Sequence, residues 1–182
     1  MIEVEIKARI KNIEEVRKKV VEAGAIFVKR EEQTDAVFGH PSMLDENKMV
    51  VEGGYIARIR EADEKIELTF KEIVRKKGKI EIGSNIGSIE IGKSFLNRLG
   101  FEEAFVVHKF RDIFKLDDFE IALDDVDLLG EFIEVEKIVN TEEKAIETRR
   151  GCSRILDNLE INYEIIDKGY GDLMQKIING QK

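Results

Sequence analysis

Alternating apolar and polar positions dominate this chain of 182 residues. In residues 2–9, Ile2, Val4 and Ile6 occupy every second position with charged residues between them, which predicts a strand with one apolar face. The same period, or a long extended run, recurs in seven further segments. The predicted strands are residues 2–9, 26–38, 54–61, 65–72, 78–84, 101–116, 118–126 and 130–137.

Apolar residues at helical spacing and capping signals predict four helices. Asn12 offers an N-cap with Glu15 three residues later, and Gly24 ends that helix. Glycines at positions 83, 87 and 92 interrupt the pattern before the second helix, so its start is not determined, and we interpret them as turn residues. The predicted helices are residues 12–24, a segment ending at residue 100, about residues 141–159 and about residues 170–178.

The order strand, helix and three strands occurs twice, which predicts an internal duplication. The repeats span about residues 1–75 and 76–138, and residues 139–182 add the last helices to a single domain. Eight antiparallel strands favour a sheet closed into a barrel, because closure removes exposed edges. The predicted fold is therefore α+β, a closed eight-stranded antiparallel barrel with helices packed outside.

The composition limits the partners that we expect. Lys and Arg number 30 and Asp and Glu number 38, and this acidic balance argues against sequence-independent binding of nucleic acid. The bias towards Lys and Glu resembles that of thermophile proteins. Cys152 stands alone, and the chain shows neither a signal peptide nor an apolar run long enough for a membrane span. We therefore expect a cytoplasmic protein with no membrane partner, as a monomer or a homodimer.

Charged side chains share one face on six of the predicted strands. If helices cover the apolar faces, the charged faces line the barrel. The carboxylates are hard oxygen donors suited to Mg²⁺ or Mn²⁺, and they are Glu3, Glu5, Asp124, Glu134 and Glu136. The cations suit phosphate oxygens, and they are Lys7, Arg58, Arg60, Lys71, Lys109 and Arg111. Together the two sets describe a site for a metal-bound polyphosphate.

A solvated outer face explains any one of these strands equally simply, because period-two patterns commonly mark antiparallel sheets with one wet side. Against this, Arg58 with Arg60, and Lys109 with Arg111, place like charges on one face. That arrangement is unfavourable unless an anion relieves it. Both interpretations remain open from the residues alone.

Six motifs, in order and spacing, resemble those of the CYTH superfamily, also called the triphosphate tunnel metalloenzymes. They are Glu-Val-Glu-Ile-Lys at residues 3–7, Ala-Arg-Ile-Arg at 57–60, Leu-Thr-Phe-Lys at 68–71, Lys-Phe-Arg at 109–111, Leu-Asp-Asp-Val at 123–126 and Leu-Gly-Glu-Phe-Ile-Glu-Val-Glu at 129–136. The resemblance implies a closed tunnel from a duplicated unit, a divalent metal on the five carboxylates and a triphosphate on the six cations. It also implies catalytic roles for Glu3, Glu5, Lys7, Glu134 and Glu136.

The chain departs from the family pattern at three places. Val37 stands where the family's Gln-x-Asp-x-Tyr-Phe stretch has Tyr. The charged pair that follows the fourth strand has no clear counterpart, and Arg75 or Glu81 are the candidates. Tyr170 lies near a Tyr-containing segment of the cyclase branch, although packing at a helix start explains it more simply.

The resemblance favours a class IV adenylyl cyclase-like enzyme that converts ATP to cyclic AMP and pyrophosphate. A triphosphatase acting on inorganic, thiamine or nucleoside triphosphate would use the same residues. A non-catalytic module that binds nucleotide or polyphosphate could dispense with some carboxylates, and all five are present, which favours an enzyme. His40 and His108 are interpreted as packing or surface residues, and no phosphate-binding glycine loop is found.

Overall fold

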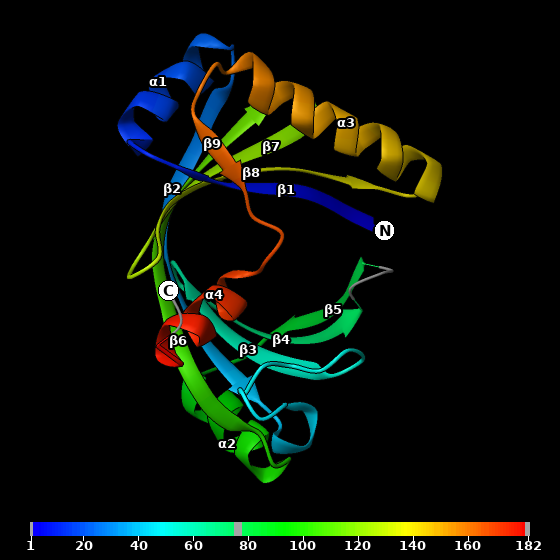
Figure 1. Ribbon diagram of the computed structural model, residues 1–182. Helices are drawn as coiled ribbons and strands as arrows, with labels where there is room; N and C mark the ends of the chain where they lie inside the picture. The colour runs from blue at the N-terminus through cyan, green and yellow to red at the C-terminus, as the bar shows by residue number, and fades with distance from the viewer. Residues whose placement is uncertain (1, 75–77, 181–182) are drawn as a thin grey trace. The chain divides into compact units, whose positions relative to one another are not determined.

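The computed structural model describes residues 2–74 and 78–180, and its elements are labelled in Figure 1. The strands are β1 (Ile2–Ile10), β2 (Ile26–Gly39), β3 (Tyr55–Ala62), β4 (Lys65–Val74), β5 (Gly78–Asn85), β6 (Glu102–Leu116), β7 (Phe119–Val126), β8 (Gly130–Val139) and β9 (Tyr163–Ile165). The helices are α1 (Ile13–Glu22), α2 (Ile89–Arg98), α3 (Glu142–Asn158) and α4 (Tyr170–Ile178), with a 3₁₀ turn at Pro41–Met43. All eight predicted strands and all four predicted helices are present.

The strands form one antiparallel sheet in the order β5-β4-β3-β2-β6-β7-β8-β1-β9. The short strand β9, which pairs with β1 through Ala8 and Ile165, was not predicted. The α+β class is confirmed. The order is linear, with β5 and β9 at its ends, so hydrogen bonds between the described strands do not close the sheet. Closure into a barrel therefore stays a prediction.

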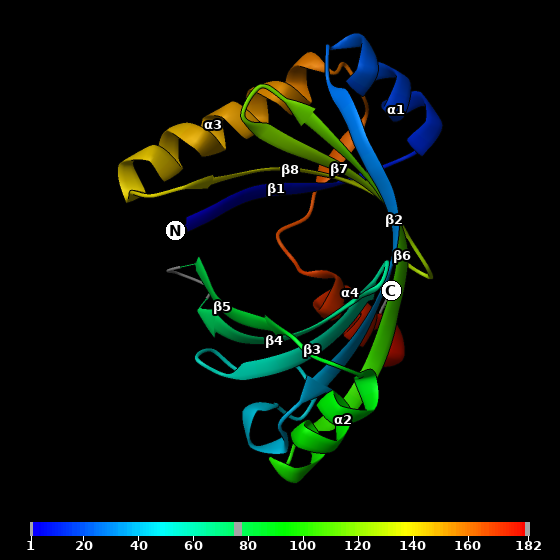
Figure 2. The same cartoon turned by 180° about the vertical axis from the view of Figure 1, so that it is seen from behind.

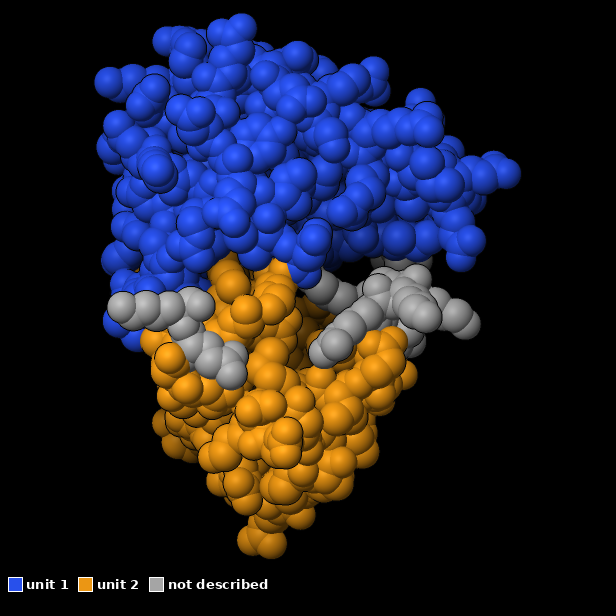
Figure 3. Space-filling view, in the orientation of Figure 1, with its two compact units in different colours: residues 1–31, 109–167 blue, residues 32–108, 168–182 orange. Residues whose placement is uncertain are grey.

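The chain divides into two compact units, coloured separately in Figure 3. The first unit contains Met1–Glu31 and Lys109–Asp167, and the second contains Glu32–His108 and Lys168–Lys182. Each unit thus combines segments of both predicted repeats. Strands β2 and β6 each contribute residues to both units.

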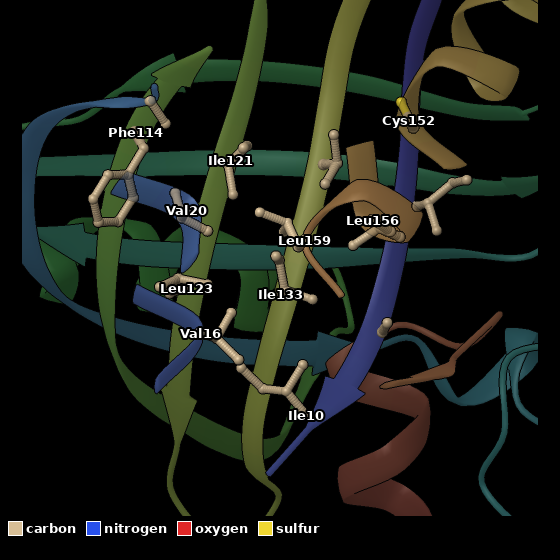
Figure 4. Packing of buried hydrophobic residues seen from close by; sticks show 14 residues of the cluster. Ile10, Val16, Val20, Phe114, Ile121, Leu123, Ile133, Cys152, Leu156 and Leu159 are labelled. Carbon is tan, nitrogen blue, oxygen red and sulfur yellow. The ribbon is translucent and has the colours of Figure 1, made fainter. Parts of the chain in front are cut away.

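In the first unit, α1 and α3 lie on the same face of β1, β7 and β8 (Figures 1 and 2). Asn12 accepts a hydrogen bond from the backbone of Glu15 at the start of α1, and Thr141 accepts one from Lys144 at the start of α3, as the sequence predicts. The helices bury apolar side chains against the sheet in a core shown in Figure 4. Its labelled members are Ile10, Val16, Val20, Phe114, Ile121, Leu123, Ile133, Cys152, Leu156 and Leu159. Since one face of each strand is committed to this core, its alternate residues must face the other way.

In the second unit, α2 covers β2 and β3. Leu96 of α2 is buried with Phe38 and Ile59 of these strands. The interpretation of the glycines as turn residues is wrong for two of them. Gly92 lies inside α2, where a Cβ atom would come within 2.8 Å of Ile59 Cδ1, and Gly83 lies inside β5. At both positions a neighbouring side chain occupies the space that a Cβ atom would take.

The last helix also belongs to the second unit. A Cβ atom at Gly171 of α4 would lie 3.6 Å from the ring of Phe105 in β6, so the helix approaches this strand closely. Asn179 at the end of α4 donates a 2.7 Å hydrogen bond to the carbonyl oxygen of Asn47. Among the helices of residues 2–74 and 78–180, none combines the length and the apolar composition that crossing a membrane requires.

Candidate functional site

Eight of the eleven predicted site residues lie in the first unit, on the face of the sheet opposite α1 and α3. They are Glu3, Glu5, Lys7, Lys109, Arg111, Asp124, Glu134 and Glu136. The strand register makes direct neighbours of residues far apart in the sequence. Glu5 pairs with Glu136 and Lys7 pairs with Glu134, while Arg111 pairs with Asp124. The alternation of polar and apolar residues along β1, β6, β7 and β8 therefore places these charged side chains on one shared face, as predicted.

Three of the carboxylates converge on this face. One oxygen from each of Glu3, Glu5 and Glu136 lies within 4.8 Å of the others. Burial, followed by the charges of Glu3 and Glu120, raises the pKa of Glu136 to about 7. A cluster of carboxylates that repel one another is stabilised by a cation, and oxygen donors of this kind are those that Mg²⁺ and Mn²⁺ prefer. These three residues fit a divalent metal.

Asp124 lies at the centre of a buried ion-pair network. The Lys109 ammonium lies 2.8 Å from Asp124 Oδ2, and Arg111 donates two hydrogen bonds of 2.6 Å to the two oxygens of the same carboxylate. Burial by itself would raise the pKa of Asp124, but Arg111 and Lys109 outweigh it, so this pKa lies below its ordinary value.

Glu134 extends the same network. Its Oε1 lies 3.0 Å from the Lys7 ammonium, and Arg111 also contacts its Oε2. Burial opposes ionisation here too, but Arg111 and Lys7 hold the pKa of Glu134 well below its usual range. In the structure, Asp124 and Glu134 are thus paired with Lys and Arg side chains. The cluster suited to a metal consists of Glu3, Glu5 and Glu136. Metal binding by Asp124 and Glu134 stays a prediction.

The remaining three predicted residues, Arg58, Arg60 and Lys71, lie in the second unit. Arg60 binds Asp35 with both ends of its guanidinium, Nε to Oδ1 and Nη2 to Oδ2, each at 2.7 Å. Arg58 Nη1 lies 3.7 Å from the same Asp35 carboxylate. Lys71 Nζ lies 2.7 Å from Glu81 Oε1. The two arginines are therefore held side by side by one carboxylate.

Asp35 was not among the predicted site residues, although a signal for it was present. It lies two residues before Val37 and hence on the same face of β2, and its register partner is Arg60. Val37, at the position where the family has Tyr, pairs with Arg58 and places an apolar side chain beside it. Arg75 lies outside the described residues.

Arg58 has an incomplete set of hydrogen bonds. Burial, followed by the charge of Arg60, lowers its pKa. Its Nη2 lies 3.4 Å from Thr69 Oγ1, and its Nε is buried without a hydrogen-bond partner among the described residues. A buried guanidinium with an unused donor fits an anionic ligand such as a phosphate group, because leaving the donor unpaired is costly.

The other residues singled out from the sequence have structural contacts. His40 Nδ1 lies 2.7 Å from Ser42 Oγ, and the ring packs edge-on against Phe101. His108 Nε2 lies 2.9 Å from Glu32 Oε1. These contacts agree with packing and surface roles. Tyr170 is the first residue of α4.

Comparison with known proteins gives consistent matches over nearly the whole chain. The CYTH domain matches residues 1–165. The chain is 32% identical over 182 residues to "Putative adenylate cyclase MJ0240" of Methanocaldococcus jannaschii, covering 95% of this chain and 98% of that protein. The structure of the PH1819 protein from Pyrococcus horikoshii OT3 matches with a TM-score of 0.81 and 28% identity, covering 96% of this chain and 99% of that one. The PH1012 protein from the same organism matches with a TM-score of 0.77 and 29% identity, over 94% and 99% of the two chains.

Proposed function

Because this chain belongs to the CYTH domain family, we propose that it is a metal-dependent enzyme acting on a triphosphate, with class IV adenylyl cyclase-like activity. One observation carries the proposal. On one face of the first unit, three converging carboxylates lie on β1 and β8, and the same two strands carry Lys7 and Glu134, which form a buried network with Arg111 of β6. A metal-bound polyphosphate needs both a cluster of oxygen donors and fixed cations.

The residues divide into two roles. Glu3, Glu5 and Glu136 would hold Mg²⁺ or Mn²⁺. When bound, such an ion neutralises phosphate charge and lowers the pKa of an attacking hydroxyl. The phosphates would be bound by Lys7, Arg58, Arg60, Lys71, Lys109 and Arg111. Positioning and charge neutralisation of this kind account for most of the catalysis in phosphoryl and nucleotidyl transfer.

Asp124 and Glu134 contribute by orienting the cations. An Arg or Lys side chain in water samples many rotamers, and fixing it costs up to about 2 kcal/mol of conformational entropy. The hydrogen bonds that Arg111 and Lys109 donate to Asp124 fix these side chains before substrate binds. The conformational entropy of these side chains is thus lost when the protein folds and not when the substrate binds.

In the cyclase reaction the 3′-hydroxyl of ATP attacks the α-phosphorus and pyrophosphate leaves. The developing negative charge on the pyrophosphate would be stabilised by the cations of the site. A triphosphatase would use the same residues with water as the nucleophile and the terminal phosphorus as its target. The two activities differ in how the substrate is oriented, and so the products distinguish them.

The test is incubation with ATP, tripolyphosphate and thiamine triphosphate, each with Mg²⁺ and with Mn²⁺, followed by product identification. Cyclic AMP and pyrophosphate are expected. Orthophosphate release would show that the protein is a triphosphatase and not a cyclase. Tight binding without any product would show that it is a non-catalytic binding module. Glu136→Gln should lose turnover, whereas Glu22→Gln, a change at an exposed carboxylate of α1, should not.

A further inference from the structure

A buried threonine hydroxyl connects two charged side chains on the polar face of the second unit. Thr69 of β4 is only 2% exposed. Its hydroxyl donates a 2.9 Å hydrogen bond to Glu67 Oε1, and its oxygen lies 3.4 Å from Arg58 Nη2, which can donate to it. The hydroxyl has one hydrogen to give, and the carboxylate takes it, so the oxygen lone pairs remain for the guanidinium.

The strand register places these groups in one row across the sheet. Arg58 of β3 is the direct partner of Thr69, and Gly83 of β5 is the direct partner of Thr69 on its other side. Asp35 restrains Arg58 only at 3.7 Å, because the same carboxylate is engaged by Arg60 at 2.7 Å. Of the two residues directly across from Arg58, Val37 on β2 and Thr69 on β4, Thr69 is the one with a polar side chain that contacts the guanidinium.

Gly83 is part of the same arrangement. A Cβ atom at Gly83 would overlap Glu67 Oε1 and would lie 3.4 Å from Thr69 Oγ1. The missing side chain thus leaves the space in which the Glu67 carboxylate reaches Thr69. This gives a reason for a glycine in the middle of β5, where glycine otherwise weakens a strand.

We propose that Thr69 is a positioning residue that orients the Arg58 guanidinium for phosphate binding, and that Glu67, in the space left by Gly83, orients Thr69. The inference rests on the proposed function, in which Arg58 binds a phosphate. Arg58 Nε is buried and has no partner among the described residues. A guanidinium that is held through Nη2 keeps its Nε–H pointing in one direction. A phosphate oxygen can then accept the hydrogen bond from Nε without the loss of further rotamer freedom by the Arg58 side chain.

A simpler explanation is that threonine stands here because β-branched residues suit strands. Thr69→Val separates the two explanations, since valine is also β-branched and of similar shape but has no hydroxyl. Thr69→Ser keeps the hydroxyl and loses the methyl group. Gly83→Ala keeps Thr69 but displaces the flexible end of Glu67. Thr34→Val is the matched control, because Thr34 lies next to Asp35 on β2 and so on the opposite face of this strand.

The experiment is calorimetric titration of each variant with tripolyphosphate in EDTA, together with KM and kcat for the triphosphate substrate. Thr69→Val should weaken tripolyphosphate binding about tenfold, the size expected for losing one hydrogen bond to a charged group. KM should rise by a similar factor. Gly83→Ala should weaken binding about threefold, and Thr69→Ser and Thr34→Val should bind like the unchanged protein.

The outcomes separate this inference from the proposed function. If the unchanged protein binds no tripolyphosphate and turns over no triphosphate, the proposed function fails, and the role of Thr69 fails with it. If the unchanged protein binds but Thr69→Val binds equally well, or if Thr69→Ser is as weak as Thr69→Val, only the positioning role is overturned. A purely structural role would lower the melting temperature and the active fraction without changing the affinity of the folded protein. Should Thr69→Val fail to fold, Gly83→Ala decides the question.

Discussion

The polar faces of the two units differ in the charges that they carry. The predicted site residues of the first unit are five carboxylates and three cations, whereas those of the second unit are three cations. In the first unit, Glu3, Glu5 and Glu136 repel one another. In the second unit, Arg58 and Arg60 repel one another and share Asp35. The first face therefore carries a carboxylate cluster suited to a metal cation beside its own Lys and Arg side chains, whereas the predicted site residues of the second face suit an anion alone, although both faces arise from the same strand periodicity.

The apolar sides of the units differ as well. Two helices, α1 and α3, cover the first unit with a large buried cluster, while α2 covers the second unit with a smaller one. The buried ion pairs around Asp124 and Glu134 lie on the face of the sheet opposite the larger cluster. Four experiments test this comparison.

The largest expected effect is on the core of the first unit. Leu156 of α3 is 1% exposed and packs in the core under β1, β7 and β8. Leu156→Ala should lower the free energy of unfolding by about 2–5 kcal/mol, because it removes buried methyl groups and leaves a cavity. Urea denaturation measures this loss. Ile146→Ala, at a position of the same helix that is 63% exposed, is the control and should change stability by less than about 0.5 kcal/mol.

Removal of one carboxylate from the three-carboxylate cluster should have the next largest effect. Glu136→Gln should reduce metal-dependent turnover about 100-fold or more, since even partners outside the metal's own ligands commonly cost about 10–100-fold. Titration of activity with Mg²⁺ and Mn²⁺ measures the change. Undiminished activity at every metal concentration would remove Glu136, and the cluster with it, from the site.

A change on the second face should affect the phosphates rather than the metal. Arg60→Lys keeps the charge but cannot form the two parallel hydrogen bonds to Asp35. We expect KM for the triphosphate to rise about tenfold, because a bidentate hydrogen bond to a charged group is lost. The metal concentration for half-maximal activity should stay unchanged. A large shift in the metal requirement would contradict the assignment of Arg60 to the phosphates.

The smallest effect expected is the stabilisation of the protein by metal alone. At a metal concentration about ten times Kd, binding adds about 1.4 kcal/mol to stability, which raises the melting temperature of a chain of this size by roughly 3–6 °C. Thermal unfolding with Mn²⁺ and with EDTA measures the shift. The double variant Glu3→Gln with Glu5→Gln should show no shift, and Arg60→Lys should keep it. An equal shift in the double variant would place the metal elsewhere.

The sequence was sufficient to predict the elements and their faces. Period-two alternation and capping residues are local signals, and they identified eight strands, four helices and the polar side of the strands that carry Lys7, Arg58 and Glu134. Local signals were weaker where context decides the structure. Strand β9 has three residues, too few for a visible pattern. Gly83 and Gly92 resembled turn residues, but in the folded chain the space beside each is occupied by a side chain from another segment, Glu67 at Gly83 and Ile59 at Gly92.

Only the tertiary structure decided which charges meet. Alternation determines the side of the sheet on which a residue lies, but the neighbour across the sheet depends on the register between strands that can be more than one hundred residues apart. The register brings Glu5 opposite Glu136, and it places Asp124 against Lys109 and Arg111. It also makes Thr69 the partner of Arg58. The chemical types of the site residues and the pairing of Arg58 with Arg60 were therefore readable from the chain, whereas the carboxylate cluster, the ion-pair network and the Asp35 carboxylate that the two arginines share required the folded sheet.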